Sequence, residues 1–199
     1  MERFSLVYID DNPDIALSRY LDQEFRGADY EIEYREILFR PDEGYKSLLQ
    51  DSQIQHANII LVDSWLFENK TATDMKFTGE EFKLILKKFF PFIEVVVITQ
   101  NTIEEDVIKI AKYDKTLGPS SSKYYAATLP SVIDKAVKNI RQYRFLAIQI
   151  ERNTSWEVVL KEKVIATLNG TCSYDDLTKS DIDKLILAFQ EIQRMINVE

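Results

Sequence analysis

The sequence has little cysteine, histidine, glycine or proline. One cysteine (Cys172) excludes an intramolecular disulfide. With one histidine (His56), the chain cannot supply the four nitrogen and sulfur ligands of a structural zinc site. Five glycines and five prolines in 199 residues argue against long low-complexity tracts. No apolar run reaches the roughly 18 residues of a membrane span, and the N-terminus lacks a signal-peptide pattern. We therefore expect a soluble, cytoplasmic protein with no membrane partner.

Positive charge is also in short supply. Lysine and arginine total 25 against 33 aspartate and glutamate residues, for a net charge of -8. Because an acidic surface repels phosphate backbones, nucleic acid is an unfavoured partner. The segment 141–199 holds eight basic and nine acidic residues and so lacks the positive footprint of a DNA-binding output domain.

Short apolar runs alternate with helical patterns over the first 140 residues. This order predicts an α/β fold, with a five-stranded parallel sheet and helices on both faces. The expected strands are 5–9, 31–38, 58–62, 94–99 and a weak fifth at 115–117. The expected helices are 15–25, one opening at Pro41, 79–90, 102–113 and 124–151, with a loop at 67–78.

The last 50 residues contain no clear strand pattern. Apolar residues recur at helical spacing over 156–168 and again from about residue 181. We expect an α/β domain over 1–141 and a helical C-terminal region over 142–199, linked by the long fifth helix. That helix could also support a homodimer.

Acidic and hydroxyl side chains stand at three expected strand ends. Asp10 and Asp11 follow the first strand, Asp63 the third and Thr99 the fourth. Ligands of such sheets bind at the carboxyl ends of the strands. Mg²⁺ prefers oxygen ligands and usually takes one or two carboxylates. The three aspartates could therefore share a cation, with Asp63 as a nucleophile towards a phosphoryl group and Thr99 presenting a hydroxyl to it.

Four segments resemble the response-regulator receiver family. Residues 6–14 are similar to its first strand and acid pair, and 59–63 to its phosphoacceptor strand. Residues 75–82 resemble the segment entering its next helix, and 95–99 the strand with its hydroxyl residue. The resemblance covers about residues 4–140.

The resemblance implies a flavodoxin-like strand order of 2-1-3-4-5 and a two-component phosphorelay function. It implies that a histidine kinase or phosphotransfer protein phosphorylates Asp63, and that a downstream protein partner reads the result. The protein would then not be mainly an enzyme, apart from slow autodephosphorylation at Asp63. The implied Mg²⁺ ligands are Asp10, Asp11, Asp63 and the backbone of Trp65.

The lysine position departs from the family pattern. Receivers carry Lys-Pro after the fifth strand, whereas this chain has Gly118-Pro119 after the expected strand, with Lys115 or Lys123 as the candidate substitute. An alternative is therefore a pseudo-receiver that keeps the fold as a protein-interaction module without phosphorylation. The two hypotheses differ in whether a lysine amine reaches Asp63. A phosphatase of the haloacid dehalogenase type is disfavoured, because Asn12 or Pro13 stands where that family needs a second acid.

Overall fold

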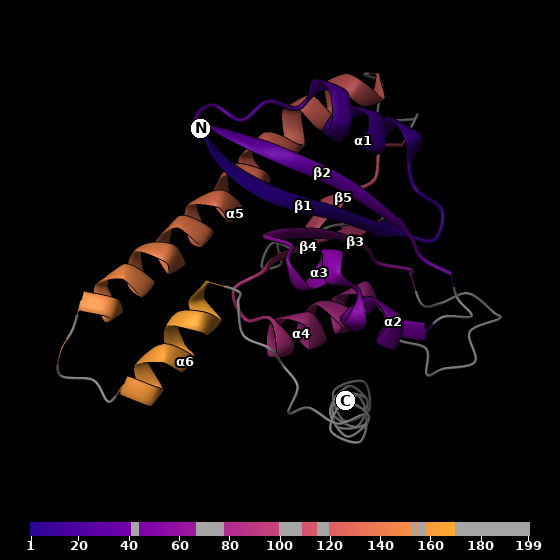
Figure 1. Ribbon diagram of the computed structural model, residues 1–199. Coiled ribbons are helices and arrows are strands. Elements are labelled where there is room, and N and C mark those ends of the chain that lie inside the picture. Colours follow the sequence, from indigo (N-terminus) through magenta and orange to yellow (C-terminus); the bar gives the residue numbers. More distant parts are fainter. Residues whose placement is uncertain are drawn as a thin grey trace, which may run out of the picture.

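A five-stranded parallel sheet forms the centre of the computed structural model (Figure 1). The structure describes residues 1–40, 44–66, 78–99, 109–114, 120–152, 154 and 158–169. The strands lie in the order β2-β1-β3-β4-β5, and all neighbouring pairs are parallel. This confirms the predicted fold class, with flanking helices and a further helix towards the C-terminus.

The strands are β1 (Glu2–Asp10), β2 (Tyr30–Leu38), β3 (Ile59–Asp63), β4 (Glu94–Thr99) and β5 (Lys109–Ala111). The helices are α1 (Ile15–Arg19), the π-helical turn η1 (Tyr20–Glu24), α2 (Gly44–Gln50), α3 (Ser52–Gln55), α4 (Gly79–Phe89), α5 (Ser121–Arg152) and α6 (Val158–Leu168).

Helices cover both faces of the sheet. In Figure 1, α1 and α5 lie on one face, and α2, α3 and α4 on the other. Successive side chains of a strand point to opposite faces. Along β1, Leu6 and Tyr8 accordingly pack beneath α1 and α5, whereas Val7 and Ile9 pack against α2 to α4. The three central strands are apolar on both faces, as buried parallel strands must be.

The position of the fifth strand corrects the sequence prediction. Residues 109–111 pair with β4 as a strand, so the predicted helix over 102–113 is wrong at its C-terminal end. Hydrogen bonding to the free edge of β4 outweighs the helical spacing read from the sequence. The expected strand at 115–117 lies outside the described residues, as do residues 67–77 of the expected loop and the helix expected from about residue 181.

The long fifth helix is continuous through residue 141, so the predicted domain boundary falls within α5. Helix α6 packs against α5 (Figure 1). Among the described residues, no helix has both the length and the apolar character to cross a membrane.

Candidate functional site

Strand register brings two of the predicted aspartates together. Ile9 on β1 is level with Val62 on β3, so Asp10 and Asp63 end adjacent strands side by side. Asp10 lies two residues after Tyr8, and Asp63 two residues after Leu61. Because alternate side chains of a strand share a face, both aspartates project to the face covered by α1 and α5. Their exposed fractions are 0% and 2%. Two carboxylates buried at this spacing require a cation or a proton between them.

Lys112 supplies a positive charge to both aspartates. It follows β5 directly, and its backbone N–H donates to the carbonyl of Thr99 at 2.7 Å. Its Nζ lies 2.6 Å from Asp63 Oδ1 and 2.9 Å from Asp10 Oδ2, and the side chain is 14% exposed. Burial alone would lower the pKa of Lys112, but the hydrogen bonds and charges of the two carboxylates outweigh burial and raise it. Lys112 therefore stays protonated at neutral pH.

Asp63 is held at both carboxylate oxygens. Oδ1 faces Lys112, and Oδ2 accepts a hydrogen bond of 2.8 Å from the backbone N–H of Trp65. Burial raises the pKa of the Asp63 carboxyl, Lys112 opposes that rise and the charge of Asp10 adds to it. The Trp65 side chain is exposed. The predicted role of the Trp65 backbone as a metal ligand stays a prediction.

Asp11 completes a cluster suited to a hard cation. Asp10, Asp11 and Asp63 can each offer an oxygen, and these oxygens lie within 4.8 Å of one another. Burial raises the pKa of Asp11, and repulsion from Asp10 and Asp63 adds to the rise. Three mutually repelling carboxylates form an all-oxygen donor set, which fits the preference of Mg²⁺.

The raised pKa of Asp11 makes its charge a cost to the metal-free fold. Asp11 favours the folded state only while it is protonated. That stabilisation is fully present below the ordinary aspartate pKa of about 4, and it is lost as the pH rises through the raised pKa of the folded state. At neutral pH, Asp11→Asn should increase the free energy of unfolding by on the order of 1 kcal/mol, because one repelling charge is removed.

Urea unfolding in EDTA at pH 7 measures this effect directly. Repeating it near pH 3, about one unit below the ordinary aspartate pKa, where Asp11 is largely protonated in both the folded and the unfolded state, provides the control, and the gain should shrink there. If Asp11→Asn destabilised the protein equally at both pH values, the charge of Asp11 would not be the cause of the stability change.

Thr99 stands at the buried C-terminal end of β4, level with Ala111 of β5. Its exposed fraction is 2%. Thr99 thus lies at the same edge of the sheet as Asp63, and its carbonyl fixes the backbone of Lys112. The phosphate-contacting role of its hydroxyl stays a prediction.

Helix α4 begins directly against the Asp63 backbone. The Gly79 N–H donates to the Ser64 carbonyl at 2.8 Å. A Cβ atom added at Gly79 would lie 2.3 Å from the Asp63 carbonyl oxygen, so only glycine permits this approach. A capping box follows, in which Thr78 and Glu81 satisfy each other's backbone N–H groups.

A polar chain links this junction to β5 on the opposite face of the sheet. The Ser64 hydroxyl donates to Glu80 Oε2 at 2.9 Å, and Lys109 Nζ lies 3.0 Å from Glu80 Oε1. The residue after Asp63 is thereby connected to the edge strand through the first turn of α4.

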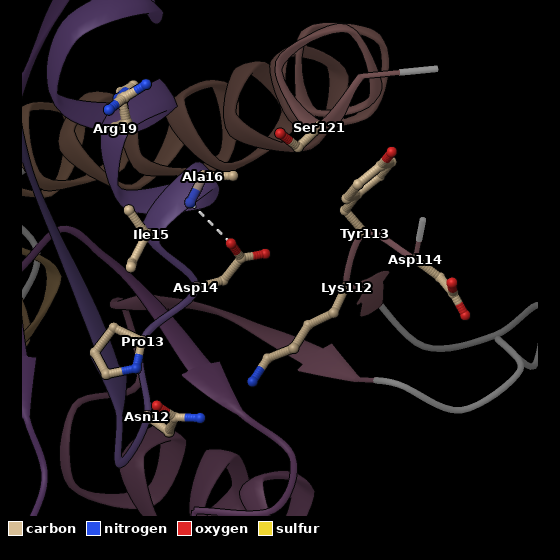
Figure 2. Close-up of a pocket in the computed structure, with 10 residues that line it drawn as sticks. All are labelled: Asn12, Pro13, Asp14, Ile15, Ala16, Arg19, Lys112, Tyr113, Asp114 and Ser121. Carbon is tan, nitrogen blue, oxygen red and sulfur yellow. Dashed lines mark hydrogen bonds between the residues drawn. The ribbon is translucent and has the colours of Figure 1, made fainter. Parts of the chain in front are cut away.

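An open cavity of about 920 Å³ borders the site on the side of α1 and α5 (Figure 2). Figure 2 shows the Lys112 side chain pointing towards Asn12, with Tyr113 above it and Asp14 across from it, next to Ala16. Asp14 caps α1 by accepting from the N–H groups of Ala16 and Leu17. The cavity gives the lysine end of the site a route to solvent.

The predicted site and the described one differ in the lysine. Lys115 lies outside the described residues, and the lysine whose Nζ lies beside Asp63 Oδ1 is Lys112. Sequence reasoning missed Lys112 because residues 102–113 were interpreted as a helix. The usable signal was the β-branched series Val107, Ile108 and Ile110 ahead of it. With β5 in place, Gly118 is not the residue that follows the fifth strand.

No protein-family model matches this chain, and no curated protein matches it significantly.

Proposed function

We propose that the chain is a response-regulator receiver that accepts a phosphoryl group on Asp63 with the help of Mg²⁺. The observation that carries the proposal is the contact of 2.6 Å between Lys112 Nζ and Asp63 Oδ1, within a cluster of three aspartates. The strand order and the residues at the strand ends agree with the receiver resemblance described above.

The carboxylate oxygens of Asp10, Asp11 and Asp63 would hold the cation. The backbone carbonyl of Trp65 is the further ligand that the resemblance implies. A bound Mg²⁺ would supply positive charge that offsets the carboxylates and an incoming phosphoryl group. Lys112 would add a fixed charge beside Asp63, where a compact ammonium suits a phosphate oxygen. Thr99 would present its hydroxyl at the same strand edge.

The bonds that form and break in the transfer belong to Asp63 and the donor alone. A carboxylate oxygen of Asp63 attacks phosphorus and forms the new P–O bond. The bond from phosphorus to the donor breaks, and its electron pair leaves with the donor: the imidazole of a phosphohistidine, or acetate from acetyl phosphate. A histidine kinase or phosphotransfer protein is the proposed donor, and a downstream protein the proposed reader.

The pseudo-receiver alternative loses its main support in the lysine position. It rests on Gly118 where a lysine is expected, on Gln100 after Thr99 and on the long loop at 67–78. The contact of Lys112 Nζ with Asp63 Oδ1 answers the first of these. A departure remains three residues before Lys112, where receivers usually have an aromatic switch residue. Here Lys109 pairs with Glu80.

Intact-mass spectrometry after incubation with acetyl phosphate and Mg²⁺ tests the proposal. We expect one added phosphoryl group per chain, no addition in EDTA and no addition to Asp63→Asn. The matched control is Asp51→Asn, which replaces the helix-capping aspartate of α3 and should leave the labelling unchanged. Absence of label from the unaltered, folded protein would favour the pseudo-receiver.

A further inference from the structure

Tyr8 makes a hydrogen bond that the proposed chemistry does not use. It lies on β1 two residues before Asp10, so the two side chains share a face. The Tyr8 hydroxyl donates to Asp10 Oδ2 at 2.5 Å, and the ring is fully buried beneath α1 and α5. A phenylalanine would fill the same space, so the hydroxyl is the distinguishing feature.

The hydroxyl is itself held in place. It accepts a hydrogen bond of 3.3 Å from the backbone N–H of Asp14. Asp14 Oδ2 in turn accepts from the Tyr125 hydroxyl of α5 at 2.5 Å. Tyr8 therefore meets Asp10 from a position fixed by two helices.

The donors around Asp10 determine which of its oxygens is left for a cation. Oδ2 accepts from both Tyr8 and Lys112, which uses the capacity of that oxygen. Oδ1 accepts one backbone hydrogen bond, from the Asn12 N–H at 2.9 Å, whereas a carboxylate oxygen has two lone pairs. Without the Tyr8 hydroxyl, the carboxylate could rotate and offer either oxygen.

We propose that Tyr8 is a positioning residue, which orients the Asp10 carboxylate so that Oδ1 is the oxygen offered to a divalent cation. This inference rests on the proposed function. Hydrogen bonds to a ligating carboxylate from outside the metal's own ligand set orient that ligand, and their loss typically costs about 10- to 100-fold in metal affinity.

The test compares Tyr8→Phe with Tyr34→Phe. Tyr34 makes the same type of contact on β2, with its hydroxyl donating to Glu36 two residues on at 2.8 Å. It lies away from the aspartate cluster, so it controls for loss of a tyrosine hydroxyl in this sheet. Isothermal titration with MgCl₂ should give a dissociation constant about 10-fold or more weaker for Tyr8→Phe and an unchanged one for Tyr34→Phe.

A double-mutant cycle shows whether Tyr8 acts through Asp10. In an Asp10→Asn background the carboxylate is gone, so Tyr8→Phe should weaken Mg²⁺ binding no further. Urea unfolding in EDTA separates this effect from a change in stability. If Tyr8→Phe does not fold, Asp10→Asn removes the other partner of the Tyr8–Asp10 hydrogen bond and is measured in its place.

The outcomes distinguish the two proposals. If the unaltered protein does not bind Mg²⁺, the proposed function fails and the role of Tyr8 fails with it. If it binds Mg²⁺ and Tyr8→Phe binds equally well, the metal site stands and the positioning role is overturned. An undiminished effect of Tyr8→Phe in the Asp10→Asn background would also overturn it.

Discussion

Replacing Lys112 with methionine should destabilise the metal-free protein by about 3–5 kcal/mol, the usual cost of removing one partner from a buried ion pair. Lys112 is the charge that Asp10 and Asp63 share, and both carboxylates are almost fully buried. Methionine keeps the length and apolar contacts of the lysine stem while deleting the ammonium. Urea unfolding in EDTA gives the loss directly.

Mg²⁺ should restore part of that stability, because a cation bound to the same carboxylates replaces some of the missing charge. Labelling of Asp63 by acetyl phosphate should nevertheless slow by about 100-fold or more, the typical effect of losing one preorganised charge or donor at a transition state. Lys123→Met, on the exposed surface of α5, is the control and should change neither result. Unchanged labelling in Lys112→Met would remove Lys112 from the proposed mechanism.

Replacing Gly79 with alanine should damage the fold and the site together. The added Cβ would lie 2.3 Å from the Asp63 carbonyl oxygen and 2.9 Å from Ser64 Cα. Both contacts are with backbone, which cannot rotate away as a side chain can. We expect a stability loss of at least about 1–3 kcal/mol, the usual cost of overpacking, and a strong reduction in Asp63 labelling.

Leu84→Ala is the matched control within the same helix. Its side chain is 48% exposed, so truncation should cost well under 1 kcal/mol and leave labelling intact. Comparing labelling per folded molecule separates displacement of Asp63 from simple unfolding. A Gly79→Ala protein as stable and as readily labelled as the unaltered chain would contradict the close approach of α4 to Asp63.

The central strands could be predicted from sequence because strands buried on both faces are continuous apolar runs. Apolar runs such as 59–62 and 95–98 have both faces covered, and each ends at the polar residue that reaches the strand edge. The positions of Asp10, Asp63 and Thr99 at one edge followed from this pattern. No long-range information was needed beyond the rule that parallel strands end together.

The fifth strand could not be predicted in this way. It has three residues and, in the part of the chain that the structure describes, pairs with β4 alone, so its identity depends on backbone hydrogen bonds to another strand rather than on its own residue pattern. The acids Glu104, Glu105 and Asp106 after Thr102 supported a helix start locally, and that interpretation hid Lys112.

The role of Tyr8 was beyond sequence reasoning for a different reason. A tyrosine in a buried strand is ordinarily a packing residue. Only the geometry shows that its hydroxyl meets Asp10 Oδ2 and is held by the Asp14 N–H. The function of such a residue depends on one polar atom within a large apolar side chain.

Reductive trapping at Asp63 tests the central claim most directly. The unaltered protein is labelled with acetyl phosphate and Mg²⁺, and borohydride then reduces an acyl phosphate to the corresponding alcohol, converting aspartate to homoserine. Peptide sequencing by mass spectrometry locates the change. Homoserine at position 63 alone, and none in EDTA, is the result predicted here. Homoserine at another carboxylate, or at none, would contradict Asp63 as the phosphoacceptor.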